Sequence, residues 1–175
     1  RIEATGHDSM REYEQYKFQL IREGEMPVPC ILIVPSKANA DSPVELRLQE
    51  EGKGTYLSEY ANFAAALTEG KILLLADLRG LGETTDPAFY TDAKYWNREY
   101  RNAMISMHIG RPIMGQRVVD ILTLLDFCSE HELLKGHSVK VFANGIYGPA
   151  TIHAAYLDER INSVEITHSV KTWME

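Results

Sequence analysis

One short segment restricts the possible folds more than any other part of this sequence. Residues 71–76 read Lys-Ile-Leu-Leu-Leu-Ala, so a continuous apolar run follows a single lysine. A strand with apolar side chains on both faces is typical of a parallel sheet that is covered by helices on each side. Gly70 stands just before the run, in the position where glycine commonly ends a helix. The segment therefore predicts a buried central strand preceded by a helix.

The rest of the chain continues this alternation of strands and helices. An antiparallel hairpin is expected first, because two strand-like segments flank a turn that contains Gly24 and Pro27. The later elements alternate, which predicts an α/β fold with a mostly parallel sheet flanked by helices. Strands are predicted at Glu14–Leu20, Val28–Val34, Val44–Leu48, Lys71–Ala76, Ser138–Ala143 and Ile161–Ile166, and helices at Leu57–Glu69, in the second half of 77–109 around Trp96, at Gly115–Glu130 and at Tyr147–Leu157.

The domain organisation follows from length and from the polar start of the chain. At 175 residues, the chain is long enough for one domain that needs no disulfide or metal to stay folded. Residues 1–15 are polar and mixed in charge, and they are interpreted as an arm that leads into the domain. Residues 16–175 are then the domain itself.

Charge and hydropathy exclude two classes of partner. The formal net charge is -7, whereas proteins that bind nucleic acid present a basic face to the phosphates. No apolar run approaches the length that is needed to cross a bilayer. We therefore expect no nucleic-acid partner and no membrane partner.

Two segments approach known cofactor or metal motifs and fail at the residues that do the chemistry. Residues 110–117 nearly match a phosphate-binding loop, but Gln116 replaces the lysine and Arg117 replaces the serine or threonine. His131 begins a zinc-protease-like pattern, but Lys135 stands in the place of the second histidine. We expect no cofactor and no metal.

The segment with most functional information runs from Val139 to Ala150. It reads as a strand, a tight turn and a helix, which is where α/β-hydrolases carry the G-x-S-x-G nucleophile elbow. In such an elbow the serine stands on a strained turn, and the next backbone N–H helps to stabilise the oxyanion. Aligning strand with strand places Gly145 at the nucleophile, whereas a shift by one residue would place Ile146 there.

Further segments resemble one group of α/β-hydrolases, the acetyl-xylan-esterase-like hydrolases. Asp77 to Glu83 is similar to the D-x-R-G-x-G segment that follows the fourth strand of the hydrolase fold. The resemblance runs from about Tyr16 to Trp173, but it covers only the front part of the family's domain. It implies an α/β-hydrolase-like sheet, truncated after the strand at 161–166. The other similar stretches are Tyr95–Tyr100, Gly110–Pro112, Gly115–Ile121, Gly148–Ala150 and His153–Ala155.

The chain departs from this family at the catalytic positions. Neither Gly145 nor its neighbours Asn144, Ile146 and Tyr147 bring a serine or cysteine to the elbow, and covalent ester hydrolysis needs an activated nucleophile. The family's acid and histidine come later in the chain order. Because only about thirty residues follow the elbow, we expect both loops to be absent from this sequence.

Two further features of the sequence bear on catalysis, a possible substitute nucleophile–base pair and the oxyanion loop. Ser169 lies beside His168, but adjacent residues on a strand point to opposite faces and are poorly placed to act together. After the third predicted strand, Gly52 and Gly54 are candidates for the oxyanion loop. The acidic pair that precedes them, residues 50 and 51, would repel a developing oxyanion.

The resemblance and the departures together define the functional hypotheses. The leading hypothesis is a hydrolase-fold domain of the acetyl-xylan-esterase-like group, with little or no esterase activity in this chain. The alternative is a non-catalytic domain that binds carbohydrate or another protein. A polysaccharide or a short-chain ester is the implied ligand. The resemblance favours an exported setting, although the chain begins at Arg1 without a signal-peptide pattern.

The last predicted strand suggests self-association. A full hydrolase sheet would continue past residues 161–166, so the outer N–H and C=O groups of this strand are expected to be open. Apolar residues Val164, Ile166 and Val170 lie along or beside it. We therefore expect a symmetric homodimer through the exposed edge strand 161–166.

Overall fold

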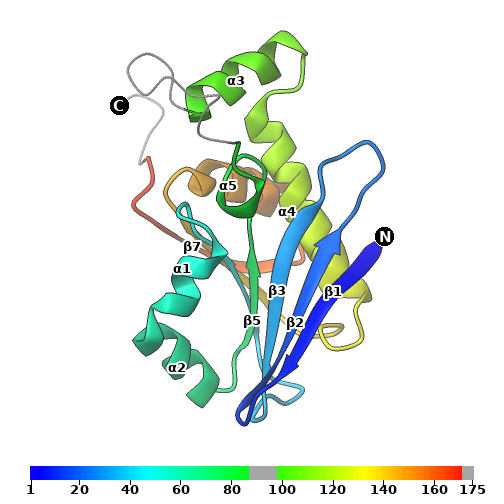
Figure 1. Ribbon diagram of the computed structural model, residues 1–175, viewed down its shortest axis with the longest axis vertical. Helices are drawn as coiled ribbons and strands as arrows, with labels where there is room; N and C mark the ends of the chain where they lie inside the picture. Colours follow the sequence, from blue (N-terminus) through cyan, green and yellow to red (C-terminus); the bar gives the residue numbers. More distant parts are fainter. Residues whose placement is uncertain (87–97, 171–175) are drawn as a thin grey trace.

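The computed structural model describes residues 1–86 and 98–170, which form a seven-stranded sheet with helices on both faces (Figure 1). The strand order is β1-β2-β3-β5-β4-β6-β7. The strands are β1 Ile2–Ser9, β2 Tyr13–Leu20, β3 Val28–Pro35, β4 Val44–Leu48, β5 Ile72–Ala76, β6 Val139–Asn144 and β7 Ile161–Thr167. The helices are α1 Lys53–Ser58, α2 Tyr60–Thr68, a 3-10 turn at Gly82–Thr84, α3 Arg98–His108, α4 Ile113–Glu130 and α5 Tyr147–Leu157.

The sheet has an antiparallel part and a parallel part. Strands β1, β2, β3 and β5 pair antiparallel in that order, and β5, β4, β6 and β7 pair in parallel. The predicted N-terminal hairpin is confirmed as the β2–β3 pair. Parallel strands joined by helices also confirm the predicted α/β class.

Strand β5 is buried on both faces, as its apolar run predicts. Ile72, Leu74 and Ala76 belong to a cluster that includes the buried side of α4, whereas Leu73 and Leu75 belong to a second cluster with residues of α1 and α2. All five residues of β5 are at most 1% exposed. The central strand therefore joins the two halves of the core.

The N-terminal arm differs from the prediction. Residues 2–9 form β1, which pairs with β2 from Ile2–Leu20 to Ser9–Glu14. Since β1 is an outer strand with mostly exposed side chains, it needs no apolar alternation, and its polar sequence gave no strand signal. Backbone pairing with β2 extends the predicted hairpin to three strands.

Two predicted helices also need correction or limitation. The helix predicted over 57–69 is two helices, because Glu59 has a ψ of 70° and interrupts the helical backbone between α1 and α2. The helix predicted around Trp96 is present as α3, but it begins at Arg98. Trp96, like Tyr95, Asn97 and Trp173, lies outside the described residues.

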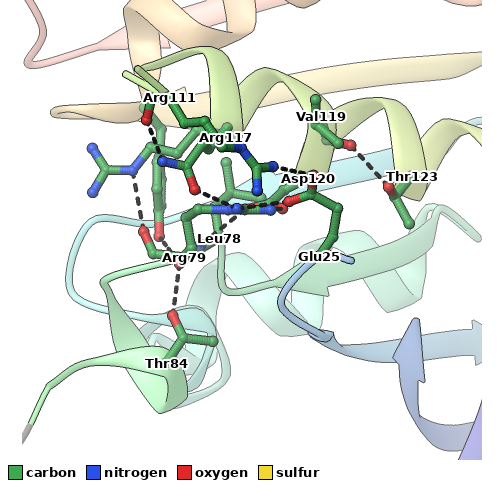
Figure 2. Close-up of polar contacts among 11 residues, drawn as sticks. Glu25, Leu78, Arg79, Thr84, Arg111, Arg117, Val119, Asp120 and Thr123 are labelled. Atoms are coloured by element: carbon green, nitrogen blue, oxygen red, sulfur yellow. Dashed lines mark hydrogen bonds and ion pairs between the residues drawn. The ribbon is translucent and has the colours of Figure 1, made fainter. Parts of the chain in front are cut away.

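A buried ionic network holds the loop after β5 against α4 and the β2–β3 turn (Figure 2). Arg79 donates to both carboxylate oxygens of Asp120, with Nη2 at 2.5 Å from Oδ1 and Nε at 2.9 Å from Oδ2. Its Nη1 lies 2.9 Å from Oε2 of Glu25 and donates to Oε1 of Gln116 at 2.6 Å. Arg111 pairs with Glu25 from the other side. Arginine suits this role because its planar fork engages several acceptors at once.

Removing one partner from this network should destabilise the fold. Asp120→Asn leaves a buried guanidinium with less compensating charge, and we expect a loss of about 3 kcal/mol in the free energy of unfolding. Urea unfolding followed by circular dichroism measures this loss. Asp126→Asn is the control, because Asp126 is 42% exposed in its pairs with Arg22 and Arg160 and should cost less than about 1 kcal/mol. Equal losses in the two variants would contradict the importance of burial.

The same network should make stability depend on acid pH. Burial raises the pKa of Glu25, but hydrogen bonds and charges from Arg79 and Arg111 outweigh it, so the pKa lies below the ordinary 4.5. A carboxylate with a lowered folded-state pKa stabilises the fold above its unfolded pKa, and this stability is lost as pH falls through the folded pKa. Glu25→Gln should therefore be less stable than wild type near neutral pH, with a difference that shrinks below about pH 4.5.

Urea titrations across this pH range test the prediction. Glu23→Gln serves as the control, because Glu23 is exposed on the same turn. A difference between Glu25→Gln and wild type that stays constant with pH would show that the Glu25 charge is not the cause.

Candidate functional site

The candidate site lies where the parallel strands β4, β6 and β7 end. Leu48 pairs with Ala143 in the parallel register of β4 and β6, so residues two positions farther along each chain lie at the same level. These residues are Glu50 and Gly145. Loops at the carboxyl ends of parallel strands commonly form the binding site of an α/β fold, and the predicted elbow is one of these loops.

The turn between β6 and α5 has one residue in the left-handed backbone region. Gly145 has a φ of +63°, in the left-handed region, whereas Ile146 has helical angles of -69° and -10°. The N–H of Gly145 donates to the carbonyl of Thr167 at 3.0 Å, and its carbonyl accepts the N–H of Gly148 at 3.2 Å. In a nucleophile elbow the nucleophile stands on the sharp corner between strand and helix, and here the left-handed corner is at Gly145, which favours Gly145 over Ile146 for that position. The assignment itself stays a prediction.

A carboxylate from the neighbouring loop lies against this turn. The N–H of Ile146 donates to Oε2 of Glu50 at 3.1 Å. A Cβ atom built on Gly145 would overlap the same oxygen. The Glu50 carboxylate therefore lies where a side chain at position 145 would begin, and it uses the N–H that follows the elbow residue.

The other two predicted neighbours, Asn144 and Tyr147, differ in their surroundings. Tyr147 is fully buried, its hydroxyl donates to the carbonyl of Leu78 at 3.3 Å, and burial raises its pKa well above the ordinary value. It is a core residue rather than a nucleophile. Asn144 faces the end of β7, where its Nδ2 donates to Oγ1 of Thr167 at 3.2 Å and lies 3.2 Å from Nδ1 of His168.

Ser169 and His168 contact different parts of the turn. The Ser169 hydroxyl lies against Gly148, so that a Cβ built there would overlap it. The His168 ring lies beside Asn144, and His168 has a φ of +51°. Both residues lie past the end of β7, and their side chains contact different residues, Asn144 for His168 and Gly148 for Ser169.

The two glycines predicted for the oxyanion loop have surroundings different from those of Glu50, which contacts the elbow turn. Gly52 caps α1 with a φ of +100°, and a Cβ on it would lie nearest to Gly82 and Asp77. Gly54 lies inside α1, and a Cβ there would meet open space. The residue of this loop that contacts the elbow is Glu50, which sequence reasoning noted only as a source of repulsion.

A buried lysine, also missed from the sequence, ties the loops after β4 and β5 together. The Nζ atom of Lys53 lies 2.7 Å from Oδ2 of Asp77 and 2.8 Å from Oε1 of Glu83. Asp77 also accepts the backbone N–H groups of Lys53 at 2.6 Å and of Glu83 at 2.9 Å. Because the ammonium group is held by two carboxylates, Lys53 positions these loops rather than offering a free base.

The described residues offer neither a metal-binding cluster nor a membrane-spanning helix. Residues 1–86 and 98–170 contain no group of three or more His, Cys, Asp or Glu side chains that could hold a metal ion. Among the described helices, none is long and apolar enough to span a membrane.

Known structures share this fold, although no family model and no curated protein sequence matches the chain. A provisionally assigned acetyl xylan esterase from Bacteroides fragilis matches 94% of this chain with a TM-score of 0.77 and 14% identity. The acetyl xylan esterase of Paenibacillus sp. R4 also matches 94% of this chain, with a TM-score of 0.69 and 18% identity. A glucuronoyl esterase from Solibacter usitatus matches 94% of this chain, with a TM-score of 0.66 and 12% identity.

The matched region is only part of these proteins. It spans 47% of the Bacteroides fragilis chain, 51% of the Paenibacillus chain and 50% of the Solibacter usitatus chain. The present chain is therefore about half as long as the esterases that it resembles. Over that half, the backbone of the chain superposes on the esterase structures, and the chain has an α/β-hydrolase-like fold.

Proposed function

We propose that this chain carries an acetyl-xylan-esterase-like hydrolase fold without ester hydrolysis at its elbow. The observation behind the proposal is the turn at Gly145, which supplies no nucleophile and is filled by the Glu50 carboxylate. The substrate class comes from the similar structures, which are named as acetyl xylan and glucuronoyl esterases. For this chain, a carbohydrate ester is accordingly the ligand class to test.

The chemistry of acyl transfer explains why this turn should be inactive. An ester is cleaved covalently only when an activated hydroxyl or thiol attacks the carbonyl, and glycine has neither. The N–H of Ile146 would be the oxyanion donor, yet it is already paired with Glu50. A carboxylate in this position would also repel the negative charge that develops in the transition state. Both contributions to catalysis are therefore missing from the turn.

A second candidate function, protein interaction, has its own observation. On α5, three large apolar side chains are exposed: Ile152 by 57%, Tyr156 by 89% and Leu157 by 63%. This helix packs beside β7, which is the outer strand of the described sheet. An apolar helix face next to an open strand edge is a surface on which another chain can add a strand and bury the helix. A second copy of this chain is the partner we propose.

Ester hydrolysis tests the main proposal directly. We expect the chain to hydrolyse a short-chain aryl acetate no faster than buffer. Gly145→Ser should also stay at background, because a hydroxyl attacks an ester only when a base activates it, and the new side chain would either displace the Glu50 carboxylate or distort the turn. Release of the aryl alcohol, followed by absorbance, is the measurement. Turnover by the unmodified chain that disappears in Ser169→Ala would place the active site elsewhere and overturn the proposal.

Light scattering over a concentration series tests the dimer. We expect a mass that rises towards that of two chains, and Tyr156→Glu should weaken this association by about tenfold or more because it places a charge on the apolar helix face. Met107→Glu is the control, since Met107 is 63% exposed on α3. A monomeric mass at every concentration, or equal effects of the two substitutions, would contradict association through α5 and β7.

A further inference from the structure

We infer that the Glu50 side chain acts as a strap across the elbow, because its carboxylate accepts the N–H of Ile146. While the carboxylate is bound there, residue 145 has no room for a side chain, so the two positions exclude each other. The inference rests on the proposed function only in identifying this turn as the elbow. It goes further because it assigns Glu50 a role: the loop after β4 holds the first turn of α5 through one carboxylate. Opening the elbow would then require that Glu50 leave.

The loop after β4 is shaped to present this carboxylate. The N–H of Gly52 donates to the carbonyl of Gln49 at 2.9 Å, which forms a tight turn with Glu50 inside it. Since Glu50 is level with Gly145 in the parallel register, its side chain needs only to cross from one strand end to the next. The hydrogen bond therefore joins Glu50 to Ile146, which are 96 positions apart in sequence, across two neighbouring strand ends.

The chemistry of the contact explains why it should persist. A hydrogen bond with a charged acceptor is stronger than one between neutral groups. The first turn of a helix also carries unpaired N–H groups that favour a negative charge. Ile146 lies directly before α5, so its N–H is such a donor and Glu50 is the acceptor that the fold supplies.

Exclusion follows from the space that the carboxylate occupies. The overlap of Oε2 with a Cβ on Gly145 involves the first atom of any side chain, so no rotamer of a new residue avoids it. Either the new side chain moves Glu50 away, or Glu50 keeps its contact and the turn is distorted. A positive φ adds strain for any residue other than glycine, whether or not Glu50 is present. Comparison of variants with and without Glu50 separates these two effects.

Amide hydrogen exchange of Ile146 tests the strap without changing the elbow residue. In Glu50→Ala, we expect the Ile146 amide to exchange faster than in the unmodified chain by about tenfold or more, because it loses a charged acceptor. In Glu51→Ala, which removes the neighbouring exposed carboxylate, we expect an unchanged rate. NMR spectroscopy resolves this single amide. An unchanged rate in Glu50→Ala would overturn the inference.

Thiol labelling tests the exclusion. Gly145→Cys should react slowly with iodoacetamide while Glu50 is present, because the carboxylate crowds the thiol and disfavours its reactive thiolate. Adding Glu50→Ala should raise the labelling rate by about tenfold or more, whereas adding Glu51→Ala should not. The native thiols give little background, since Cys30 and Cys128 are 2% and 4% exposed and burial raises the pKa of both.

The outcomes distinguish this inference from the proposed function. Equal labelling with and without Glu50, in variants that keep the wild-type circular dichroism spectrum, would contradict the exclusion even if the chain hydrolyses no ester. If the unmodified chain hydrolyses esters while Ile146 exchange and thiol labelling depend on Glu50, the proposed function is wrong and the strap stands.

Discussion

The parallel pairing of β4 with β6 is the constraint on which the rest of the site depends. It brings Leu48 beside Ala143, and so places the residues that follow each strand against one another. Because of this register, the carboxylate of Glu50 meets Gly145 and accepts the N–H of Ile146. A shift in the register would move Glu50 away from the turn. The chemical character of the site is thus fixed by a pairing within the sheet.

Two further groups of contacts keep the strand ends in place. On one side, Arg79 joins α4 and the β2–β3 turn through Asp120 and Glu25. On the other, Lys53 and Asp77 join the loops after β4 and β5. Both groups bury charges, which is costly unless the charges are paired and hydrogen-bonded. The fold therefore holds its loops by ionic contacts while leaving no nucleophile at the central turn.

The sequence predicted most of the architecture because the central elements have strong local patterns. The apolar run of β5 and the strand–turn–helix segment at Gly145 both depend on neighbours in sequence, and both are present. β1 was missed because it is an outer strand, whose polar residues carry no alternation. The contact of Glu50 could not be found from spacing, since it depends on which strands are adjacent and in what register. The sequence shows that Glu50 is acidic, but it does not show that the N–H of Ile146 is its partner.

The most direct test of the account is covalent labelling with a fluorophosphonate, which reacts with activated serine nucleophiles and is detected by intact-protein mass spectrometry. The account predicts an unchanged mass for the unmodified chain, because the elbow carries Gly145 and its oxyanion donor is paired with Glu50. A stoichiometric adduct on a serine of this chain would contradict the central claim, since it would show that an activated nucleophile exists outside the turn.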